Sequence, residues 1–302
     1  MALSDYLATE VGEDWADGIL SRREALRRLA LLGLSASSAI ALLEACAPTG
    51  PASPSSASGS AGSGSGSSPA TAGEFPIEGE AITFGDQQRL RGFFGAAKSV
   101  PRGAMLVIHE NRGLNDHTRS VASRLARDGY SALAIDLLSE EGGTDAVAQG
   151  EVQAVLSRAT SERLVGDMNA GLDELERRAP GAKLGIIGFC FGGGMVWALL
   201  NAGTPRLAAA IPFYGPAPAS PDFSADRAAV FGVYAELDER VNASRPTAEA
   251  ALKAAGLEYQ IKVYPGVDHA FFNDTGARYN SQQATAAYAD VLDWLGTHLS
   301  GG

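Results

Sequence analysis

From residue 74 to the C-terminus, short apolar runs alternate with longer segments that mix polar and apolar residues. Short apolar runs are typical of buried strands, and the longer segments between them predict helices. This alternation indicates β-α-β units, so we expect one α/β domain with a mostly parallel central sheet flanked by helices. The predicted strands are 90–95, 104–109, 131–135, 184–188, 208–213, 229–234 and 258–264. The predicted helices are 118–128, 162–178, 191–201, 244–255 and 281–298.

The N-terminal part of the chain has the pattern of an export signal. Arg22 and Arg23, with Leu26 behind them, form a twin-arginine pattern ahead of an uncharged apolar run at 29–43. The run is shorter than the roughly 20 residues that span a bilayer, but it fits a signal-peptide core of about 7 to 15 residues. The alternative is an amphipathic surface helix, which we disfavour because Leu, Ala and Ser occupy all faces of the run.

A tether follows the signal. Residues 43–46 resemble a bacterial lipobox ending in Cys46, the residue that would carry the lipid, although Glu44 departs from the usual pattern. Residues 47–73 contain only Ala, Pro, Ser, Thr and Gly, a composition that favours a flexible linker spanning roughly 30 Å. We therefore expect a signal peptide at 1–46, a linker at 47–73 and a globular domain at 74–302. The expected location is the periplasm or cell envelope, with membrane contact only through a lipid on Cys46.

Composition and charge argue against one class of partner, nucleic acid, and against a disulfide-rich scaffold. The chain of 302 residues is 45% hydrophobic and 20% charged, as is ordinary for a globular protein. A net charge of -11 with 24 Lys and Arg residues argues against nucleic-acid binding. Two cysteines, Cys46 and Cys190, make a disulfide framework improbable, so each needs its own explanation.

Cys190 lies in a G-x-C-x-G pattern between a predicted strand and a predicted helix. This is the nucleophile-elbow pattern with sulfur in place of the serine oxygen. The turn is so tight that Gly188 and Gly192, two residues before and after the nucleophile, must lack bulky side chains. A thiol at a helix N-terminus also has a lowered pKa. The alternative is a buried structural cysteine beside a glycine-rich turn.

An elbow nucleophile needs a base and an orienting acid, which follow it along the chain in the order acid, then histidine. His269, in the loop after the strand 258–264, is the better base, because His298 lies on the terminal helix near the end of the chain. Asp238 is the preferred acid, as the first residue of a D-x-x-V pattern after the strand 229–234. Glu236 is the reserve candidate, and a solvated acidic loop is the structural alternative.

These motifs together resemble the dienelactone hydrolase family over residues 80–299. The five matching segments are 107–114, 134–137, 188–192, 238–241 and 264–273. The resemblance implies an α/β-hydrolase fold and a Cys-His-Asp triad. It also implies that Glu110 contacts the resting thiol, and that the backbone amides of Asn111 and Phe191 form the oxyanion hole.

The expected activity is hydrolysis of a small-molecule ester or lactone through a thioester acyl-enzyme, with no metal and no organic cofactor. Relatives that cleave dienelactones hold the substrate carboxylate with arginines, and one of those positions is Asn273 here. Arg112 and Arg278 are the residues that could reach the pocket by another route. The alternatives are acyl transfer or thioesterase chemistry on the same triad, and a lipid-anchored binding protein without turnover.

Overall fold

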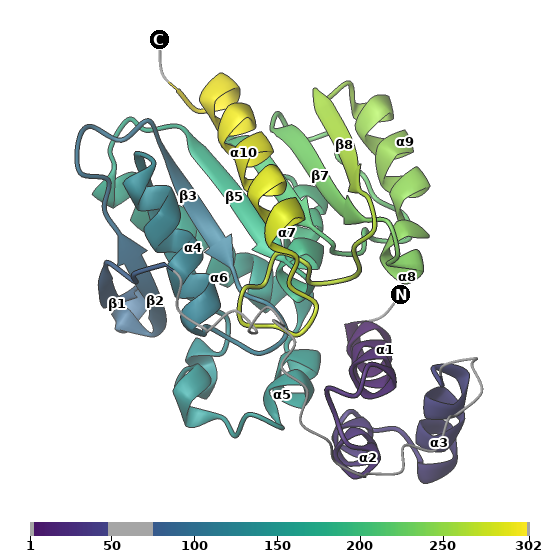
Figure 1. Cartoon of the computed structure of the whole chain (residues 1–302). Coiled ribbons are helices and arrows are strands. Elements are labelled where there is room, and N and C mark those ends of the chain that lie inside the picture. The colour runs from purple at the N-terminus through teal and green to yellow at the C-terminus, as the bar shows by residue number, and fades with distance from the viewer. Residues whose placement is uncertain (1–2, 48–74, 301–302) are drawn as a thin grey trace, which may run out of the picture.

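The computed structural model describes residues 3–47 and 75–300. Eight strands form one sheet in the order β1-β2-β4-β3-β5-β6-β7-β8 (Figure 1). β1 and β2 pair antiparallel with each other and β2 pairs antiparallel with β4, whereas all other neighbours are parallel. The strands are β1 (Glu80–Phe84), β2 (Leu90–Gly95), β3 (Gly103–Ile108), β4 (Tyr130–Asp136), β5 (Leu184–Phe189), β6 (Leu207–Phe213), β7 (Ala229–Ala235) and β8 (Tyr259–Tyr264).

The predicted α/β fold is confirmed, and each predicted strand is present to within one or two residues. β3, β4, β5 and β7 are buried at every position, because helices cover both faces of the parallel part of the sheet. The sequence missed β1. Only Phe84 of this edge strand is buried, so its alternation is too weak to identify it.

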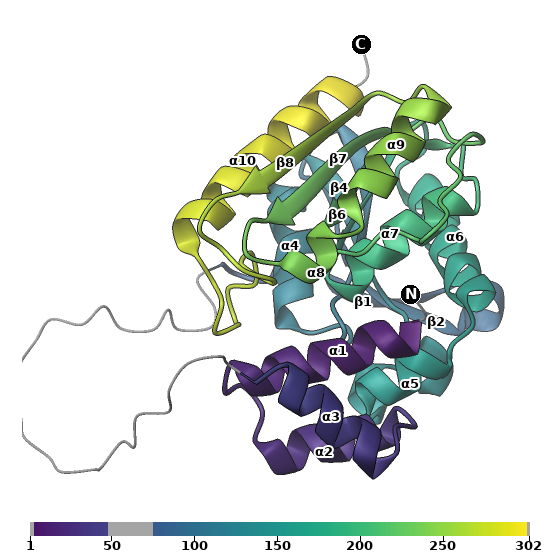
Figure 2. The same cartoon turned by 90° about the vertical axis from the view of Figure 1, so that its right-hand side faces the viewer.

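Helices cover the sheet on both faces (Figure 2). α4 (Asp116–Arg127) and α10 (Ser281–His298) pack on one face, while α6 (Ser161–Arg178), α7 (Phe191–Asn201) and α9 (Arg245–Ala255) pack on the other. These are the five predicted helices. Two short helices were not predicted, α5 (Val152–Arg158) and α8 (Glu239–Asn242).

The N-terminal residues form three helices, α1 (Leu3–Ala16), α2 (Arg22–Leu31) and α3 (Ala36–Ala45). They enclose a small apolar cluster of their own that includes Val11, Leu29 and Leu43. The apolar run 29–43 is thus divided between α2 and α3, with Gly33 at φ +88° in the turn. No helix among residues 3–47 and 75–300 is long and apolar enough to cross a membrane. The predicted linker, apart from Ala47, lies outside the described residues.

α1 also belongs to the main domain. It lies across the end of the sheet at which β3, β5 and β7 terminate, between α5 and α8 (Figures 1 and 2). Tyr6 and Leu7 are buried in the main apolar core. The structure therefore places α1 at the edge of the sheet where parallel α/β proteins carry their functional residues.

Candidate active site

Cys190 occupies the turn between β5 and α7 with φ +56°. A Cβ at Gly188 would stand 2.2 Å from the Gly192 carbonyl oxygen, and one at Gly192 would stand 2.5 Å from that of Ile108. Any side chain at either position would therefore collide with backbone. The turn holds the thiol in a conformation that few non-glycine residues adopt, and such strain is typical of functional sites.

His269 and Asp238 come from the loops after β8 and β7. The His269 Nδ1 donates a hydrogen bond of 2.6 Å to Asp238 Oδ2, and the Val241 amide donates to Oδ1 at 3.0 Å. All three side chains, Cys190 included, are buried. The Asp238 carboxylate fixes the orientation of the imidazole, so Nε2 is the ring nitrogen directed at the thiol side of the site.

The protonation states of Cys190 and His269 depend on the charged residues around them. The sequence predicted a lowered pKa for the Cys190 thiol, but burial raises this pKa and the carboxylate of Glu10 raises it further. Burial alone would lower the pKa of His269, but Glu10 and Asp238 together hold it well above its ordinary value. Burial likewise would raise the pKa of Asp238, yet the imidazole keeps it below its usual range. The arrangement favours a protonated imidazole beside a neutral thiol.

Glu110, the second residue after β3, lines the same cavity as Cys190, and its predicted contact with the resting thiol stays a prediction. Its carboxylate accepts hydrogen bonds from Asn273 Nδ2 at 2.6 Å and from Tyr214 Oη at 3.4 Å. The His109 Nδ1 lies 2.6 Å from the Glu110 carbonyl oxygen, while Nε2 accepts from the Leu137 amide. Asn273 therefore binds the carboxylate of Glu110 through a neutral amide.

The two residues expected to form the oxyanion hole flank Cys190. Phe191 is the first residue of α7, so its amide is one of the N–H groups that the helix cannot satisfy internally. Asn111 is buried and lines the same cavity as Cys190. The oxyanion-hole role of the two amides stays a prediction.

The remaining candidates from the sequence lie elsewhere. The Glu236 carboxylate accepts a hydrogen bond of 2.7 Å from the Gly266 amide, which closes the turn before His269. His298 packs against Trp294 and lies 3.7 Å from Glu258. Neither belongs to the group around Cys190.

Two residues of α1 that sequence reasoning missed complete the site. The Tyr6 Oη lies 3.3 Å from Cys190 Sγ. The Glu10 carboxylate lies 3.8 Å from the same sulfur and 3.5 Å from His269 Nε2. The spacing of Tyr6 and Glu10 places them on one helix face, which is the signal that could have found them. The sequence pattern of this segment predicts a signal peptide, in which no site residue is expected.

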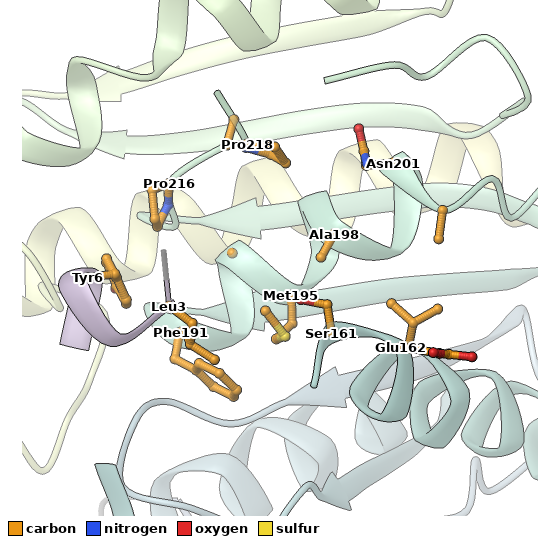
Figure 3. A pocket seen from close by; sticks show the side chains of 14 residues that line it. Leu3, Tyr6, Ser161, Glu162, Phe191, Met195, Ala198, Asn201, Pro216 and Pro218 are labelled. Atoms are coloured by element: carbon orange, nitrogen blue, oxygen red, sulfur yellow. The ribbon is translucent and has the colours of Figure 1, made fainter. Parts of the chain in front are cut away.

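One cavity is lined by the nucleophile, and a second is lined by the residue that follows it, Phe191. One, of about 230 Å³, contains Cys190 and His269 and is lined by polar groups that include Arg112 and Arg278. The other, of about 560 Å³, is mainly apolar and lies beside α7, with Tyr6 and Phe191 among its lining residues (Figure 3). Tyr6 thus borders the apolar cavity and contacts the thiol at the same time. Both arginines that we had considered for the pocket do reach it.

One set of side chains could hold a metal ion. The donor atoms of Glu10, Cys190 and His269 lie within 4.8 Å of one another, a donor set that suits Zn²⁺. The Glu10 carboxylate already forms an ion pair with Arg240. A dication would have to bind beside that guanidinium, so we interpret the cluster as an ion-pair network.

A mostly parallel sheet with a cysteine elbow after β5, and a histidine and an acid in later loops, defines an α/β-hydrolase. Residues 90–299 match the Dienelactone hydrolase family. The chain belongs to this family, and its membership supports hydrolase activity on an ester or a lactone.

Individual relatives agree with this family. A protein of Methylorubrum extorquens named "Putative carboxymethylenebutenolidase" is 32% identical over 66% of this chain and 73% of its own length. An Escherichia coli K12 protein of the same name is 31% identical over 65% and 77%. The crystal structure titled "Putative Dienelactone Hydrolase" from Klebsiella pneumoniae superposes with a TM-score of 0.65 and 25% identity. That alignment covers 74% of this chain and 100% of the other.

Proposed function

We propose that the protein hydrolyses small carboxylic esters or lactones, of the kind that carboxymethylenebutenolidases cleave, with Cys190 as nucleophile. The observation that carries the proposal is the group of three buried side chains, in which Asp238 orients His269 and His269 faces the thiol at the elbow. The chemistry of these residues needs no metal or organic cofactor. The expected partner is the small-molecule substrate, with no nucleic acid.

In the first half-reaction, His269 Nε2 takes the proton from Cys190 as sulfur attacks the ester carbonyl carbon. The tetrahedral oxyanion accepts hydrogen bonds from the amides of Phe191 and Asn111, each worth roughly 2.7 to 4 kcal/mol. The imidazolium then returns its proton to the alkoxide oxygen, the C–O bond breaks, and a thioester remains on Cys190. For a lactone, the alkoxide stays attached to the same acyl chain.

In the second half-reaction, neutral His269 takes a proton from water as the water oxygen attacks the thioester carbonyl. The C–S bond breaks, the sulfur recovers its proton from the imidazolium, and the carboxylic acid leaves. Asp238 stays ionised throughout and stabilises the imidazolium in both steps. Glu110, held by Asn273 and Tyr214, keeps the loop after β3 in place beside the nucleophile.

The test measures hydrolysis of p-nitrophenyl acetate by the wild type and by Cys190→Ala. We expect turnover by the wild type, no turnover by the variant, and a mass increase on Cys190 of one acetyl group in rapidly quenched samples. A domain without residues 1–74 that binds esters without turnover would contradict the proposal. Full activity of Cys190→Ala would assign the reaction to another nucleophile.

We also propose that the chain is exported and anchored. The proposal is supported by the twin-arginine pattern, whose Arg22 and Arg23 are exposed at the start of α2, and by the lipobox-like residues that end at Cys46. On this proposal the mature protein begins at Cys46. It would then contain the catalytic domain without α1.

A further inference from the structure

α1 occupies the space that a substrate needs. A carbonyl carbon must stand about 3 to 3.5 Å from the attacking sulfur, with the catalytic base within hydrogen-bond reach. The Glu10 carboxylate already lies 3.8 Å from Cys190 Sγ and 3.5 Å from His269 Nε2. The Tyr6 hydroxyl contacts the sulfur at 3.3 Å. An ester cannot enter between these groups while α1 is in place.

Charge complementarity holds α1 at this position. Arg240 forms ion pairs with Glu10 and with Glu13, the latter at 2.8 Å, and its guanidinium lies 4.7 Å from the centre of the Tyr6 ring. Asp14 lies between two arginines, 3.5 Å from Arg112 and 3.7 Å from Arg278.

The Arg278 side chain also pairs with Asp17, at 2.5 Å. The carboxylates at positions 10, 13 and 14 lie on one face of α1, and Asp17 follows directly after its last residue, so this side of the segment meets all three arginines around the site.

The packing of α1 supports the same interpretation. Leu7 is fully buried in the main core, and Tyr6, Glu10 and Asp14 are at most 6% exposed. Two carboxylates, those of Glu10 and Asp14, are thus removed from water, which is costly unless they are paired. The pairing with Arg240, Arg112 and Arg278 meets that cost, so the contact is a specific one.

From this geometry we infer that α1 is an intramolecular inhibitor, a helix that closes the active site until the N-terminal segment leaves. The inference rests on the proposed function, because the closed site is the proposed catalytic one. It adds a regulatory step: the full chain is the closed form, and a chain that lacks residues 1–46 is open. Apparent activity then scales with the fraction of molecules in which α1 is undocked.

The experiment compares the full chain with a chain of residues 75–302. The solved relative from Klebsiella pneumoniae aligns over its whole length with 74% of this chain, which shows that a domain of this kind folds without a counterpart of the remainder. Two rates are measured, p-nitrophenyl acetate hydrolysis and iodoacetamide alkylation of Cys190, followed by peptide mass spectrometry. If α1 is undocked in 1 to 10% of molecules, both rates should rise roughly 10- to 100-fold on truncation.

Point variants test the inhibitory role of α1 within the full chain. Leu7→Asp places a charge in the buried contact of α1 and should raise both rates toward those of the truncated chain. Asp5→Asn, at an exposed position on the same helix, is the matched control and should leave both rates unchanged. Circular dichroism of Leu7→Asp checks that the domain stays folded.

The two rates separate the two proposals. Equal alkylation rates in the full and truncated chains, with Leu7→Asp also unchanged, would overturn the inhibitory role of α1. If the alkylation rate of Cys190 rises on truncation but no form hydrolyses the ester, the inhibitory role of α1 is supported and the hydrolase assignment is contradicted. If all forms hydrolyse the ester and react with iodoacetamide at equal rates, the hydrolase assignment is supported and the inhibitory role of α1 is contradicted.

Discussion

His269 is bound on one side by Asp238 and faces the Cys190 thiol on the other, so its loss removes proton transfer. We expect His269→Ala in the residue 75–302 chain to lower kcat on the order of 10⁴-fold with little change in Tm. His298→Ala is the control, because that ring packs on Trp294 and should leave kcat unchanged. Near-normal turnover by folded His269→Ala would remove this residue from the mechanism.

The second prediction at this scale concerns pH. The groups that face His269 are Glu10, Asp238 and Cys190, with the Tyr214 ring against one edge. Because the Glu10 carboxylate is the largest of the influences that raise the pKa of His269, Glu10→Gln in the full chain should lower this pKa. Only the neutral imidazole can accept the thiol proton, so activity is lost as pH falls through the pKa. The acid limb of the kcat/KM profile should therefore move to lower pH in Glu10→Gln, and an unmoved limb would contradict the assignment.

Single residues were predictable where their role is local. Cys190 is marked by its two glycines, and His269 and Asp238 by their positions after strands. The partners of Glu110 could not be predicted, since Asn273 is 163 positions away and only the packed loops bring the two together. His109 shows the same limit: the ring fixes the backbone of Glu110, yet in the sequence it is only one more residue at the end of a strand.

At the level of elements, the elbow between β5 and α7 makes a prediction about stability. A methyl group at Gly192 would stand within 2.6 Å of two carbonyl oxygens of β3 and the residue after it, so backbone must shift. We expect Gly192→Ala to lower the free energy of unfolding by about 1 to 3 kcal/mol. Gly166 of α6 is exposed with no atom within 4 Å, so Gly166→Ala should instead raise it by about 1 kcal/mol.

Urea denaturation followed by circular dichroism measures the free energy of unfolding of both variants. The two substitutions are chemically identical, so any difference between their effects comes from the surroundings of the two glycines. An equal effect of the two would show that the close approach of α7 to β3 is not what requires glycine at position 192.

Elements were predictable in proportion to their burial. The strands buried on both faces stand out as apolar runs, whereas β1 exposes most of its residues and was missed. α1 was missed for another reason. Its buried face toward the domain carries Glu10 and Asp14, and carboxylates in a sequence normally indicate a solvated face. Only the arginines of other loops make that face an inward one.

For the molecule as a whole, the N-terminal segment supports a test of export. A reporter fused to residues 1–75 should leave the cytoplasm of a suitable bacterial host, and Arg22→Lys combined with Arg23→Lys should retain it. Cell fractionation with a reporter that is active only after export measures this. Export that survives the double substitution would indicate the general secretory route, and retention of the unaltered fusion would contradict a signal peptide at 1–46.

Gly12 of α1 faces Cys46, the residue directly after α3. A Cβ at Gly12 would stand 2.8 Å from the Cys46 sulfur, so the sulfur takes the place of that side chain. A sulfur that carries a lipid cannot keep this contact, and lipid attachment therefore requires α3 to separate from α1. If the chain is cut ahead of Cys46, as we propose, α1 becomes a separate peptide and loses the millimolar effective concentration that a tether provides. Dilution would then make opening of the site irreversible, so one proteolytic cut would serve both to mature the anchor and to commit the enzyme to its open form.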